Sequence, residues 1–534
     1  MSKQMLLKEL SRYNSGTFTD ILYRNALLYQ DEEAFIYGDE RITHGEYNEA
    51  VNRIIHALQK MNVDGSKPVS ILSWNSLPSV IAYGTTLKGK YIASMLNPRL
   101  TVDELEYIIK YSETDTIFVG PELVETVTSL KPRVPQIKHF IVLEGTAEGM
   151  ITFQDLLDTY PADEPDMKVD EDDLTCIIYT SGTTGVPRGA LYTQRCFIDD
   201  SRTFALNINV QQHDRHLQVT PQFHIAGNTW LRTFLYAGAC TVIHKFFDPL
   251  KTLQAIQNEK ATHMNIVPTQ IVAMLNTPGF ADYDLSSMKL IWYGASPMPL
   301  EVLKRGLQHF GCIFGEGYGQ SESGPAISHM PREDHDVLDK PEAQQKHLAS
   351  AGRPDIGVQV RIVDENGNDC EPGTIGEIIV KSKHIMVGYW KKPDDTKNTI
   401  IDGWLYTGDM GYYDEKGYIY IADRKKDMII SGGENVFPRE VEEILYKHPA
   451  VLEAAVIGIP DDYWVEKVHA VIVTRKGQSV TPEEITAFCK KHIAGYKTPK
   501  SIEFVDALPK NAAGKILKKE LREKYRGEQT KTKQ

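Results

Sequence analysis

The sequence predicts an α/β protein with a large N-terminal part and a small α+β domain at the C-terminal end. Short apolar runs alternate with amphipathic stretches over the first two thirds of the 534 residues, hairpin patterns begin near residue 355, and an order of helix, strand, strand and helix follows Asp427. Hydrophobic residues make up 41% of the chain, which is enough to bury large cores. We expect two doubly wound α/β subdomains, then a small β-barrel-like unit, then the C-terminal domain.

The strands expected in the first two thirds are brief, β-branched or aromatic, and almost continuously apolar. This composition is typical of strands that are buried on both faces of a parallel sheet by covering helices. The amphipathic stretches 101–111 and 300–310 are examples of those helices. The expected strands are residues 68–74, 115–120, 139–143, 174–179, 240–246, 263–267 and 289–293.

The pattern after residue 355 changes to antiparallel hairpins. Residues 358–363 and 376–380 flank the turn residues Gly367 and Gly373, and residues 412–421 form a second hairpin, so we expect a β-rich unit over about 355–422. The last expected elements are a helix, two strands and a helix, at residues 438–448, 451–458, 468–473 and 482–492. We place the domain boundary so that residues 1–425 form the large part and 426–534 the small domain, whose polar tail from Arg526 is expected to be disordered.

Charge and cysteine usage exclude several classes of protein. A net charge of −13 repels nucleic-acid phosphate, so a nucleic-acid partner is not expected. The six scattered cysteines contain no Cys-x-x-Cys pair, which argues against a disulfide framework or a zinc site. Because no signal-peptide core and no apolar run of about 20 residues is present, we expect a cytoplasmic protein without integral membrane association. Peripheral membrane contact is left open.

The segment that follows the expected strand 174–179 has the composition of a phosphate-binding loop. Glycines let the backbone approach a ligand closely, and hydroxyl groups and N–H groups donate hydrogen bonds to phosphate oxygens. No Gly-Lys-Ser/Thr ends it, so it is not a Walker loop. A solvated surface loop is the alternative, which the position after a buried strand disfavours. The segment contains Thr180, Ser181, Gly182, Thr183, Thr184, Gly185, Arg188 and Gly189.

This string resembles the signature of the adenylate-forming superfamily, which comprises acyl-CoA synthetases, peptide-synthetase adenylation domains and luciferases. The resemblance covers nearly the whole chain, with five motifs in the family's order between residues 180 and 515, and is closest to fatty-acid or aryl-acid CoA ligases. It implies that residues 1–425 are an AMP-binding domain and that ATP, Mg²⁺ and coenzyme A are used. The family usually has lysine where Arg188 stands, and arginine keeps the charge but presents a planar fork.

Two further motifs resemble the family's adenine and metal segments. In the motif 317–322, which resembles Tyr-Gly-x-Thr-Glu, the resemblance implies that Tyr318 packs against adenine, Ser321 contacts the α-phosphate and Glu322 helps to hold Mg²⁺. A carboxylate suits a hard cation. The remaining residues that the resemblance places around the nucleotide are Gly294, Ala295, Ser296, Gly317, Gly319 and Gln320.

The later motifs imply a mobile C-terminal domain. The resemblance implies that Asp409 binds the ribose hydroxyls and that Arg424 contacts the ribose and the phosphate. It also implies that Lys426 is the hinge about which the domain turns. Lys515 would reach the substrate carboxylate and the α-phosphate during adenylation. The residues that would line the coenzyme A channel after the turn are Ser431, Gly432 and Gly433.

The segment 221–228 resembles the family's acyl-pocket motif. No acidic residue stands near His224, so an α-amino acid substrate is disfavoured because its ammonium would be buried unpaired. Gly319 stands where acetate-specific relatives place tryptophan, which leaves room for a larger apolar acid. His224 either gates the pocket or is a structural histidine. The acyl-pocket residues are His224, Gly227, Asn228 and Gly319; Trp230, Trp292 and Tyr293 either line the pocket or form plain core.

The resemblance implies an ATP-dependent, AMP-forming acid–CoA ligase for a medium-to-long-chain fatty acid or a similar apolar monocarboxylic acid. An aryl or alicyclic carboxylate such as benzoate is the alternative substrate. A stand-alone peptide-synthetase-like adenylation enzyme, a luciferase-like oxygenase and a non-catalytic nucleotide-binding protein are the rival classes. The expected partners are small molecules, and the oligomeric state is open, with a homodimer as one alternative. The residues expected to act in catalysis are Thr184, His224, Glu322 and Lys515.

Overall fold

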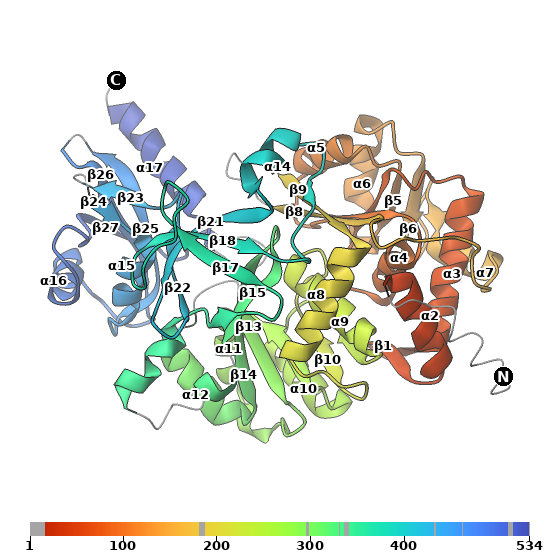
Figure 1. The fold of residues 1–534 in the computed structure, drawn as a ribbon, viewed down its shortest axis with the longest axis horizontal. Helices are drawn as coiled ribbons and strands as arrows, with labels where there is room; N and C mark the ends of the chain where they lie inside the picture. The colour runs from red at the N-terminus through yellow and green to blue at the C-terminus, as the bar shows by residue number, and fades with distance from the viewer. Residues whose placement is uncertain are drawn as a thin grey trace.

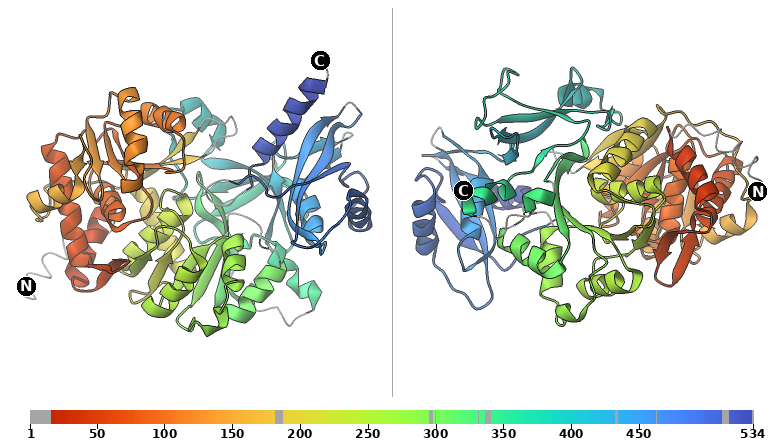
Figure 2. Two further views of the ribbon diagram at one scale, coloured as in Figure 1. Left: turned by 180° about the vertical axis from the view of Figure 1, so that it is seen from behind. Right: turned by 60° about the horizontal axis from the view of Figure 1, so that its bottom comes forward.

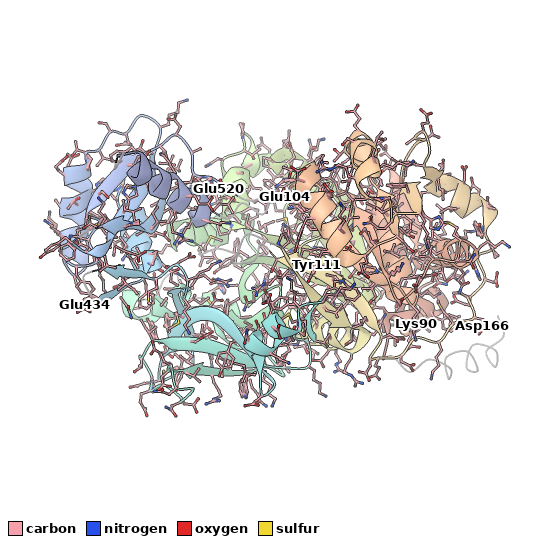
Figure 3. All side chains as sticks on the ribbon, turned by 90° about the horizontal axis from the view of Figure 1, so that it is seen from above. Lys90, Glu104, Tyr111, Asp166, Glu434 and Glu520 are labelled. Atoms are coloured by element: carbon pink, nitrogen blue, oxygen red, sulfur yellow. The ribbon has the colours of Figure 1, made fainter. Side chains whose placement is uncertain are left out.

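The part of the chain that the structure describes folds into four β-sheets with helices between and around them. The computed structural model describes residues 16–180, 187–294, 298, 300–330, 332–335, 341–431, 434–461, 463–510 and 516–532. Over these residues the molecule is elongated, with the N-terminal helices at one end and the C-terminal sheet at the other (Figure 1). Seen from above, Glu434 and Glu520 lie toward one end, Lys90 and Asp166 at the other, and Glu104 and Tyr111 between them (Figure 3).

The first sheet has eight strands in the order β19-β9-β8-β4-β3-β5-β6-β7, and its central strands are parallel. Apolar side chains of α5 and α6 cover one face, and those of α3, α4 and α7 cover the other. The predicted strands of this part are confirmed. The elements are α2 Phe18–Leu28, α3 His44–Lys60, β3 Pro68–Leu72, α4 Leu77–Lys88, β4 Ile92–Leu96, α5 Val102–Ser112, β5 Thr116–Val119, α6 Val124–Leu130, β6 His139–Val142, β7 Ile151–Thr152, α7 Phe153–Thr159, β8 Leu174–Thr180, β9 Arg188–Thr193 and β19 Gly388–Tyr389.

The second sheet has nine strands in the order β16-β15-β14-β13-β12-β10-β11-β1-β2. Helices α10, α11 and α12 cover one face, while α8 and α9 lie between this sheet and the first and contribute to the core of both. The elements are β1 Glu33–Tyr37, β2 Glu40–Thr43, α8 Gln194–Asn207, β10 Arg215–Gln218, α9 Ile225–Ala237, β11 Cys240–Ile243, α10 Pro249–Glu259, β12 His263–Ile266, α11 Pro268–Leu275, β13 Leu290–Gly294, α12 Leu300–Phe310, β14 Ile313–Gln320, β15 Gly324–Met330, α13 Arg332–His335 and β16 Arg353–Pro354.

The third sheet contains the two predicted hairpins, which are confirmed. Its order is β17-β18-β21-β20, with β22 paired to β21, and both hairpins are antiparallel. In the right-hand view of Figure 2 this unit lies above the second sheet and beside the C-terminal sheet. Its elements are β17 Gln359–Val363, β18 Gly376–Lys381, α14 Pro393–Thr399, β20 Ile400–Ile401, β21 Trp404–Tyr413 and β22 Ile419–Arg424.

The C-terminal sheet has the order β24-β23-β26-β25, with β27 beside β26, and carries the predicted helices on its faces. The disorder expected from Arg526 is wrong, because α17 continues to Thr532. Lysine, arginine and glutamate are good helix formers, and Lys519 pairs with Glu523 one turn away. The elements are β23 Ile429–Ser431, β24 Glu434–Val436, α15 Pro438–Tyr446, β25 Val451–Asp461, β26 Val465–Thr474, α16 Pro482–His492, β27 Ser501–Phe504 and α17 Lys518–Thr532.

The state of the cysteines and the length and polarity of the helices bear on two expectations from the sequence. All six cysteines are free, and five of them are buried, as expected of small apolar residues. Within the described ranges, no helix is long and apolar enough to cross a membrane.

Val465 begins β26 in a strained conformation. Its φ is +68°, a left-handed value that β-branched residues rarely adopt, and its side chain is 68% exposed, so little packing offsets the strain. We expect Val465→Gly to raise the free energy of unfolding by about 1 kcal/mol, since glycine adopts this φ freely. Urea denaturation measures the change. Leu452→Gly, at an exposed position on β25 with ordinary φ, is the control and should destabilise; equal loss in both variants would contradict the strain.

Candidate active site

Three of the predicted nucleotide-binding residues form one hydrogen-bonded cluster. The hydroxyl of Tyr318 donates to one oxygen of Asp409 at 2.6 Å, and Nε of Arg424 lies 2.6 Å from the other oxygen. Asp409 and Arg424 face each other as partners in β21 and β22, while Tyr318 comes from β14, so the cluster joins two sheets. The carboxylate is therefore held by two donors that come from different parts of the chain.

Burial and the charge of Asp409 together shift the pKa values of the two donors in this cluster. Burial alone would lower the pKa of Arg424, but the negative charge of Asp409 raises it above its ordinary value. Burial and the same carboxylate raise the pKa of Tyr318, which keeps its hydroxyl a donor. Gln320 completes the group, because its Nε2 donates to the carbonyl of Thr407 at 3.2 Å and its Oε1 accepts from Arg424 at 3.4 Å.

The candidate phosphate loop connects two antiparallel strands. Thr180 ends β8 and pairs with Arg188 at the start of β9. The Oγ1 of Thr180 and the Nε of Arg188 are buried without a hydrogen-bond partner in the described part of the chain. Because buried donors are rarely left unpaired, these two atoms fit a bound anion. The other predicted loop residues, Ser181, Gly182, Thr183, Thr184 and Gly185, lie outside the described residues.

Glu322 lies just after β14, beside the phosphate-loop hairpin. One of its carboxylate oxygens accepts a hydrogen bond from the hydroxyl of Tyr389 at 2.9 Å, and its carbonyl accepts from the N–H of Met386. Among the described residues, no group of three or more histidine, cysteine, aspartate or glutamate side chains could hold a metal ion. A single carboxylate fits Mg²⁺, since this ion is usually held by one or two carboxylates, substrate phosphates and water.

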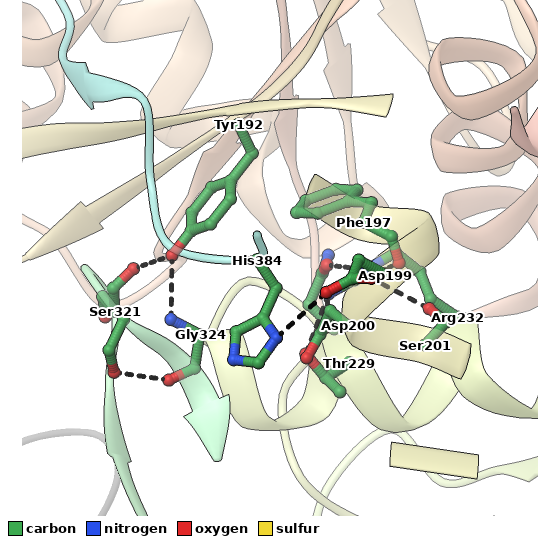
Figure 4. Close-up of polar contacts among 12 residues, drawn as sticks. Tyr192, Phe197, Asp199, Asp200, Ser201, Thr229, Arg232, Ser321, Gly324 and His384 are labelled. Carbon is green, nitrogen blue, oxygen red and sulfur yellow. Dashed lines mark hydrogen bonds and ion pairs between the residues drawn. The ribbon is translucent and has the colours of Figure 1, made fainter. Parts of the chain in front are cut away.

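Ser321 is fixed through its backbone. Its carbonyl accepts a hydrogen bond from the hydroxyl of Tyr192, which in turn accepts from the N–H of Gly324 at 3.3 Å, as Figure 4 shows. Tyr192 is fully buried on β9. The turn that carries the predicted phosphate and metal contacts is therefore attached to the strand that follows the phosphate loop.

Glycine is required where β13 and β14 approach each other. A side chain at Gly294 would meet the carbonyl oxygen of Gly317 at 2.7 Å. Side chains at Gly315 and Gly317 would each meet the indole of Trp292 at 2.6 Å. Trp292 therefore lies over the β14 glycines, on the sheet face that α9 covers. Gly319 is partly exposed on the same strand, and Ala295 and Ser296 lie outside the described residues.

The predicted acyl-pocket residues lie at the start of α9. His224 precedes the helix, packs against the ring of Phe223 at 4.6 Å, and has a buried Nε2 without a partner among the described residues. Burial lowers its pKa to about 4, so the imidazole is neutral at physiological pH. A side chain at Gly227 would meet the carbonyl oxygen of Pro221 at 2.3 Å, which makes glycine obligatory there. Trp230 and Tyr293 are buried and belong to the core.

Asn228 belongs to a buried network that the motif comparison did not reveal. Its Oδ1 accepts from the hydroxyl of Tyr83 and from Arg232 at 2.8 Å each. Arg232 has no exposed surface, lies 2.7 Å from Asp200 and stacks on the ring of Phe197, as Figure 4 shows. Arg232 is the one charged residue of the helix Ile225–Ala237, and this is the sequence signal for the network. The network joins α8 to α9, the helix that His224 begins.

His216 is a buried histidine whose titration we expect to affect the pH dependence of the free energy of unfolding. It packs against the rings of Trp230 and Phe234, and it hydrogen-bonds Asn265 through Nε2, while Nδ1 is buried without a partner among the described residues. Burial lowers its pKa from 6.5 to about 3. Its stabilising contribution is therefore complete above pH 6.5 and is lost as the pH falls toward the folded-state value.

We expect wild type to lose about 1.4 kcal/mol of unfolding free energy per pH unit below 6.5 relative to His216→Gln, which does not titrate. Urea denaturation of both proteins between pH 7.5 and pH 4.5 measures the difference. Parallel pH profiles would contradict the burial of an uncharged histidine.

The segment around Lys426 borders a cavity of about 260 Å³. Asp427 accepts a hydrogen bond from Arg522 of α17 at 2.7 Å in an ion pair, and Lys518 at the start of α17 pairs with Glu442 of α15 at 2.8 Å. The helix that follows residue 515 is thus attached to the predicted hinge. Ser431 is buried at the end of β23, whereas Gly432, Gly433 and Lys515 lie outside the described residues. The cavity is lined by Lys426, Asp427, Met428, Gly458, Glu466, Lys519, Arg522 and Glu523.

Two family models match the chain. The model of the AMP-binding enzyme matches residues 22–390, and the model of the AMP-binding enzyme C-terminal domain matches residues 440–515. The first range contains Arg188 and Glu322 and the second ends at Lys515, whereas Ser431 lies between the two ranges.

Known proteins resemble the chain along most of its length. A feruloyl-CoA synthase from Amycolatopsis sp is 34% identical, covering 94% of this chain and 98% of the relative. A medium/long-chain-fatty-acid–CoA ligase from Mycobacterium tuberculosis is 31% identical, covering 93% and 88%. The crystal structure of an anthranilate CoA ligase in complex with anthranoyl-AMP superposes with a TM-score of 0.87 at 27% identity, covering 97% of this chain and 98% of that one. The chain therefore belongs to the AMP-binding enzyme family.

Proposed function

We propose that this protein joins an apolar monocarboxylic acid to AMP and then transfers the acyl group to the thiol of coenzyme A. The observation that carries the proposal is the cluster of Tyr318, Asp409 and Arg424, which is suited to a ribose and a phosphate. Its Tyr318 lies on β14, the strand that leads to Glu322. The unpartnered donors of Thr180 and Arg188 support a phosphate at the β8–β9 hairpin. Membership of the AMP-binding enzyme family and the names of its relatives support the ligase class.

In the first step a carboxylate oxygen of the substrate attacks the α-phosphorus of ATP, and pyrophosphate leaves. Negative charge grows on the phosphoryl oxygens, and fixed donors and cations stabilise it. We assign this stabilisation to Lys515, to Arg188 and to the hydroxyl of Thr184. Mg²⁺, when bound, neutralises phosphate charge, and Glu322 would hold it. Asp409 accepts hydrogen bonds from the ribose hydroxyls and keeps the nucleotide in place.

In the second step the thiolate of coenzyme A attacks the acyl carbonyl, and AMP leaves. Lys515 occupies the approach to the carbonyl during the first step, so it must withdraw before the thiol enters. We propose that the C-terminal domain, residues 426–534, turns at Lys426 and brings Ser431, Gly432 and Gly433 to the site. One mobile domain then serves both half-reactions.

A medium-to-long-chain fatty acid is the proposed substrate. His224 is neutral and has no carboxylate within the segment 221–228 that could pair with a substrate ammonium, which favours an acid without an amino group. Gly319 leaves the strand beside the nucleotide cluster without a side chain. A substrate ammonium would be left unpaired there, whereas an alkyl chain has no charge to bury.

An aryl acid is the second candidate, and the position of Trp292 favours it. Its indole already fills the space over Gly315 and Gly317, which shortens any pocket that runs along β14. We expect Trp292→Leu to raise kcat/KM for dodecanoate relative to benzoate by about 10-fold, since extra apolar contact in a pocket contributes about 1–3 kcal/mol. Steady-state kinetics of wild type and the variant with dodecanoate and with benzoate give the ratio of the two kcat/KM values. Trp404→Ala, on β21, is the control, and an unchanged ratio in Trp292→Leu would exclude Trp292 as the boundary of the pocket.

Acid-dependent exchange of labelled pyrophosphate into ATP tests the proposal. The panel contains straight-chain fatty acids, benzoate and cinnamate derivatives, and α-amino acids. We expect exchange with at least one apolar monocarboxylic acid and none with amino acids, followed by AMP release only when coenzyme A is added. Exchange with amino acids, or release that ignores coenzyme A, would favour a peptide-synthetase-like adenylation enzyme, and no exchange with any acid would reject adenylation.

A further inference from the structure

We propose that Tyr389 is a positioning residue that holds the phosphate-loop cation Arg188 and the carboxylate of Glu322 in a fixed relation. The guanidinium of Arg188 lies over the ring of Tyr389, with the guanidinium carbon 4.4 Å from the ring centre. The hydroxyl of Tyr389 donates a hydrogen bond to the carboxylate of Glu322 at 2.9 Å. One side chain thus touches both the candidate phosphate-binding group and the candidate metal ligand. This inference rests on the proposed function.

The backbone around Tyr389 is anchored on the phosphate-loop hairpin itself. Strand β19 pairs with β9, and Tyr389 lies opposite Ala190. Its N–H donates to the hydroxyl of Thr396 at 2.9 Å, and the next N–H, of Trp390, donates to the carbonyl of Gly189 at 2.8 Å. The residue is buried, so its ring has one place to lie. A rigid support of this kind is what a positioning role needs.

The planar ring explains why arginine suits position 188. A guanidinium stacks face to face on an aromatic ring, whereas an ammonium is a compact point charge that prefers hydration. Arg188 also lies 3.9 Å from Asp395 of α14, so the guanidinium is held between a ring and a carboxylate. Its Nε stays without a partner among the described residues and is available to a phosphate oxygen.

The hydroxyl of Tyr389 determines which oxygen of Glu322 is free. One oxygen accepts a hydrogen bond from the phenol hydroxyl, so the carboxylate cannot rotate without losing that hydrogen bond. The second oxygen accepts no hydrogen bond from the described residues and is left as a ligand for a hard cation. Outer hydrogen bonds of this kind orient metal ligands, and their loss weakens metal binding by about 10-fold to 100-fold.

The test measures Mn²⁺ binding by electron paramagnetic resonance in the presence of a non-hydrolysable ATP analogue. Tyr389→Phe keeps the ring under Arg188 and removes only the hydroxyl, so we expect the dissociation constant of Mn²⁺ to rise by about 10-fold. Arg188→Lys removes the stacked guanidinium, and we expect weaker binding of the analogue without a comparable change in Mn²⁺ affinity. Tyr413→Phe removes a hydroxyl that bonds the carbonyl of Cys370 and is the matched control.

A second comparison protects the test against a general loss of structure. In a Glu322→Gln background the carboxylate is absent, so adding Tyr389→Phe should cause no further loss of Mn²⁺ affinity. Additive losses, or a Tyr389→Phe protein that binds Mn²⁺ as tightly as Tyr413→Phe, would overturn the positioning role. Failure of wild type to bind the ATP analogue at all would reject the proposed function, which is a separate result from the variant comparison.

Discussion

Lys515→Ala should lose about 10³-fold in the rate of acyl-adenylate formation, while the transfer of the acyl group from supplied acyl-AMP to coenzyme A stays near the wild-type rate. Removing one donor that faces developing charge costs about 10²-fold to 10³-fold in catalysed acyl transfer, and Lys515 is also proposed to bring the substrate carboxylate to the phosphate. The second half-reaction is proposed to take place with Lys515 withdrawn. Pyrophosphate exchange measures the first rate, and AMP release from synthetic acyl-AMP measures the second.

The contacts of α17 fit the proposed withdrawal of Lys515 by a turn of the C-terminal domain. Lys510 and Ile516 form a β-bridge that flanks residue 515, and α17 begins directly after it. The ion pair between Arg522 and Asp427 attaches this helix beside the predicted hinge. If the segment at Lys426 is the hinge that we propose, we expect its movement to carry Lys515 with it.

Lys510→Ala is the control for this prediction. Lys510 forms an ion pair with Glu453 of β25, and it lies close to Lys515 in sequence. The Lys510→Ala protein should catalyse both half-reactions at wild-type rates. Equal losses of both half-reactions in Lys515→Ala would contradict the proposed division of labour between the two domain positions.

Arg232→Met should destabilise the protein by about 3–5 kcal/mol, because it leaves Asp200 as a buried carboxylate without its cation. The double variant Arg232→Met/Asp200→Leu removes both charges and should recover most of the loss, since apolar replacements of buried ion pairs are often neutral. Denaturant unfolding of wild type, both single variants and the double variant gives the coupling between the two side chains.

The sign of the coupling distinguishes two accounts of this network. A double variant that is more stable than Arg232→Met indicates that the cost is the unpaired charge of Asp200. Additive losses would indicate that Arg232 acts through its contacts with Phe197 and Asn228 instead. Because the network attaches α9 to α8, we also expect Arg232→Met to alter the acyl-acid preference in the pyrophosphate exchange panel.

Much of the fold follows from local patterns. The continuous apolar strands and the Gly367 hairpin were predictable because neighbouring residues carry their signals. The pairing of Phe35 with Thr241 was not, because the two residues are far apart in sequence and no periodicity records which edge of a sheet a strand joins. The tail beyond Arg526 was mispredicted because its polar residues, which predict disorder by composition, are also strong helix formers.

The candidate site divides in the same way. Tyr318, Asp409 and Arg424 each lie in a motif that can be recognised in the sequence, and the structure brings the three together. Tyr389 carries no such signal, because its role depends on two partners from distant strands. Arg232 could have been noticed as the one charged residue of its helix, but its partner on α8 could not be named without the packing of the two helices.

Transfer of oxygen-18 from a labelled carboxylic acid tests the central claim most directly. An acid that exchanges pyrophosphate is labelled in its carboxylate and incubated with ATP, Mg²⁺ and coenzyme A, and the nucleotide product is analysed by mass spectrometry. Attack of a carboxylate oxygen on the α-phosphorus predicts AMP that carries one oxygen-18 atom. Unlabelled AMP, or label found in inorganic phosphate beside ADP, would contradict an acyl-adenylate formed at the site of Tyr318, Asp409 and Arg424.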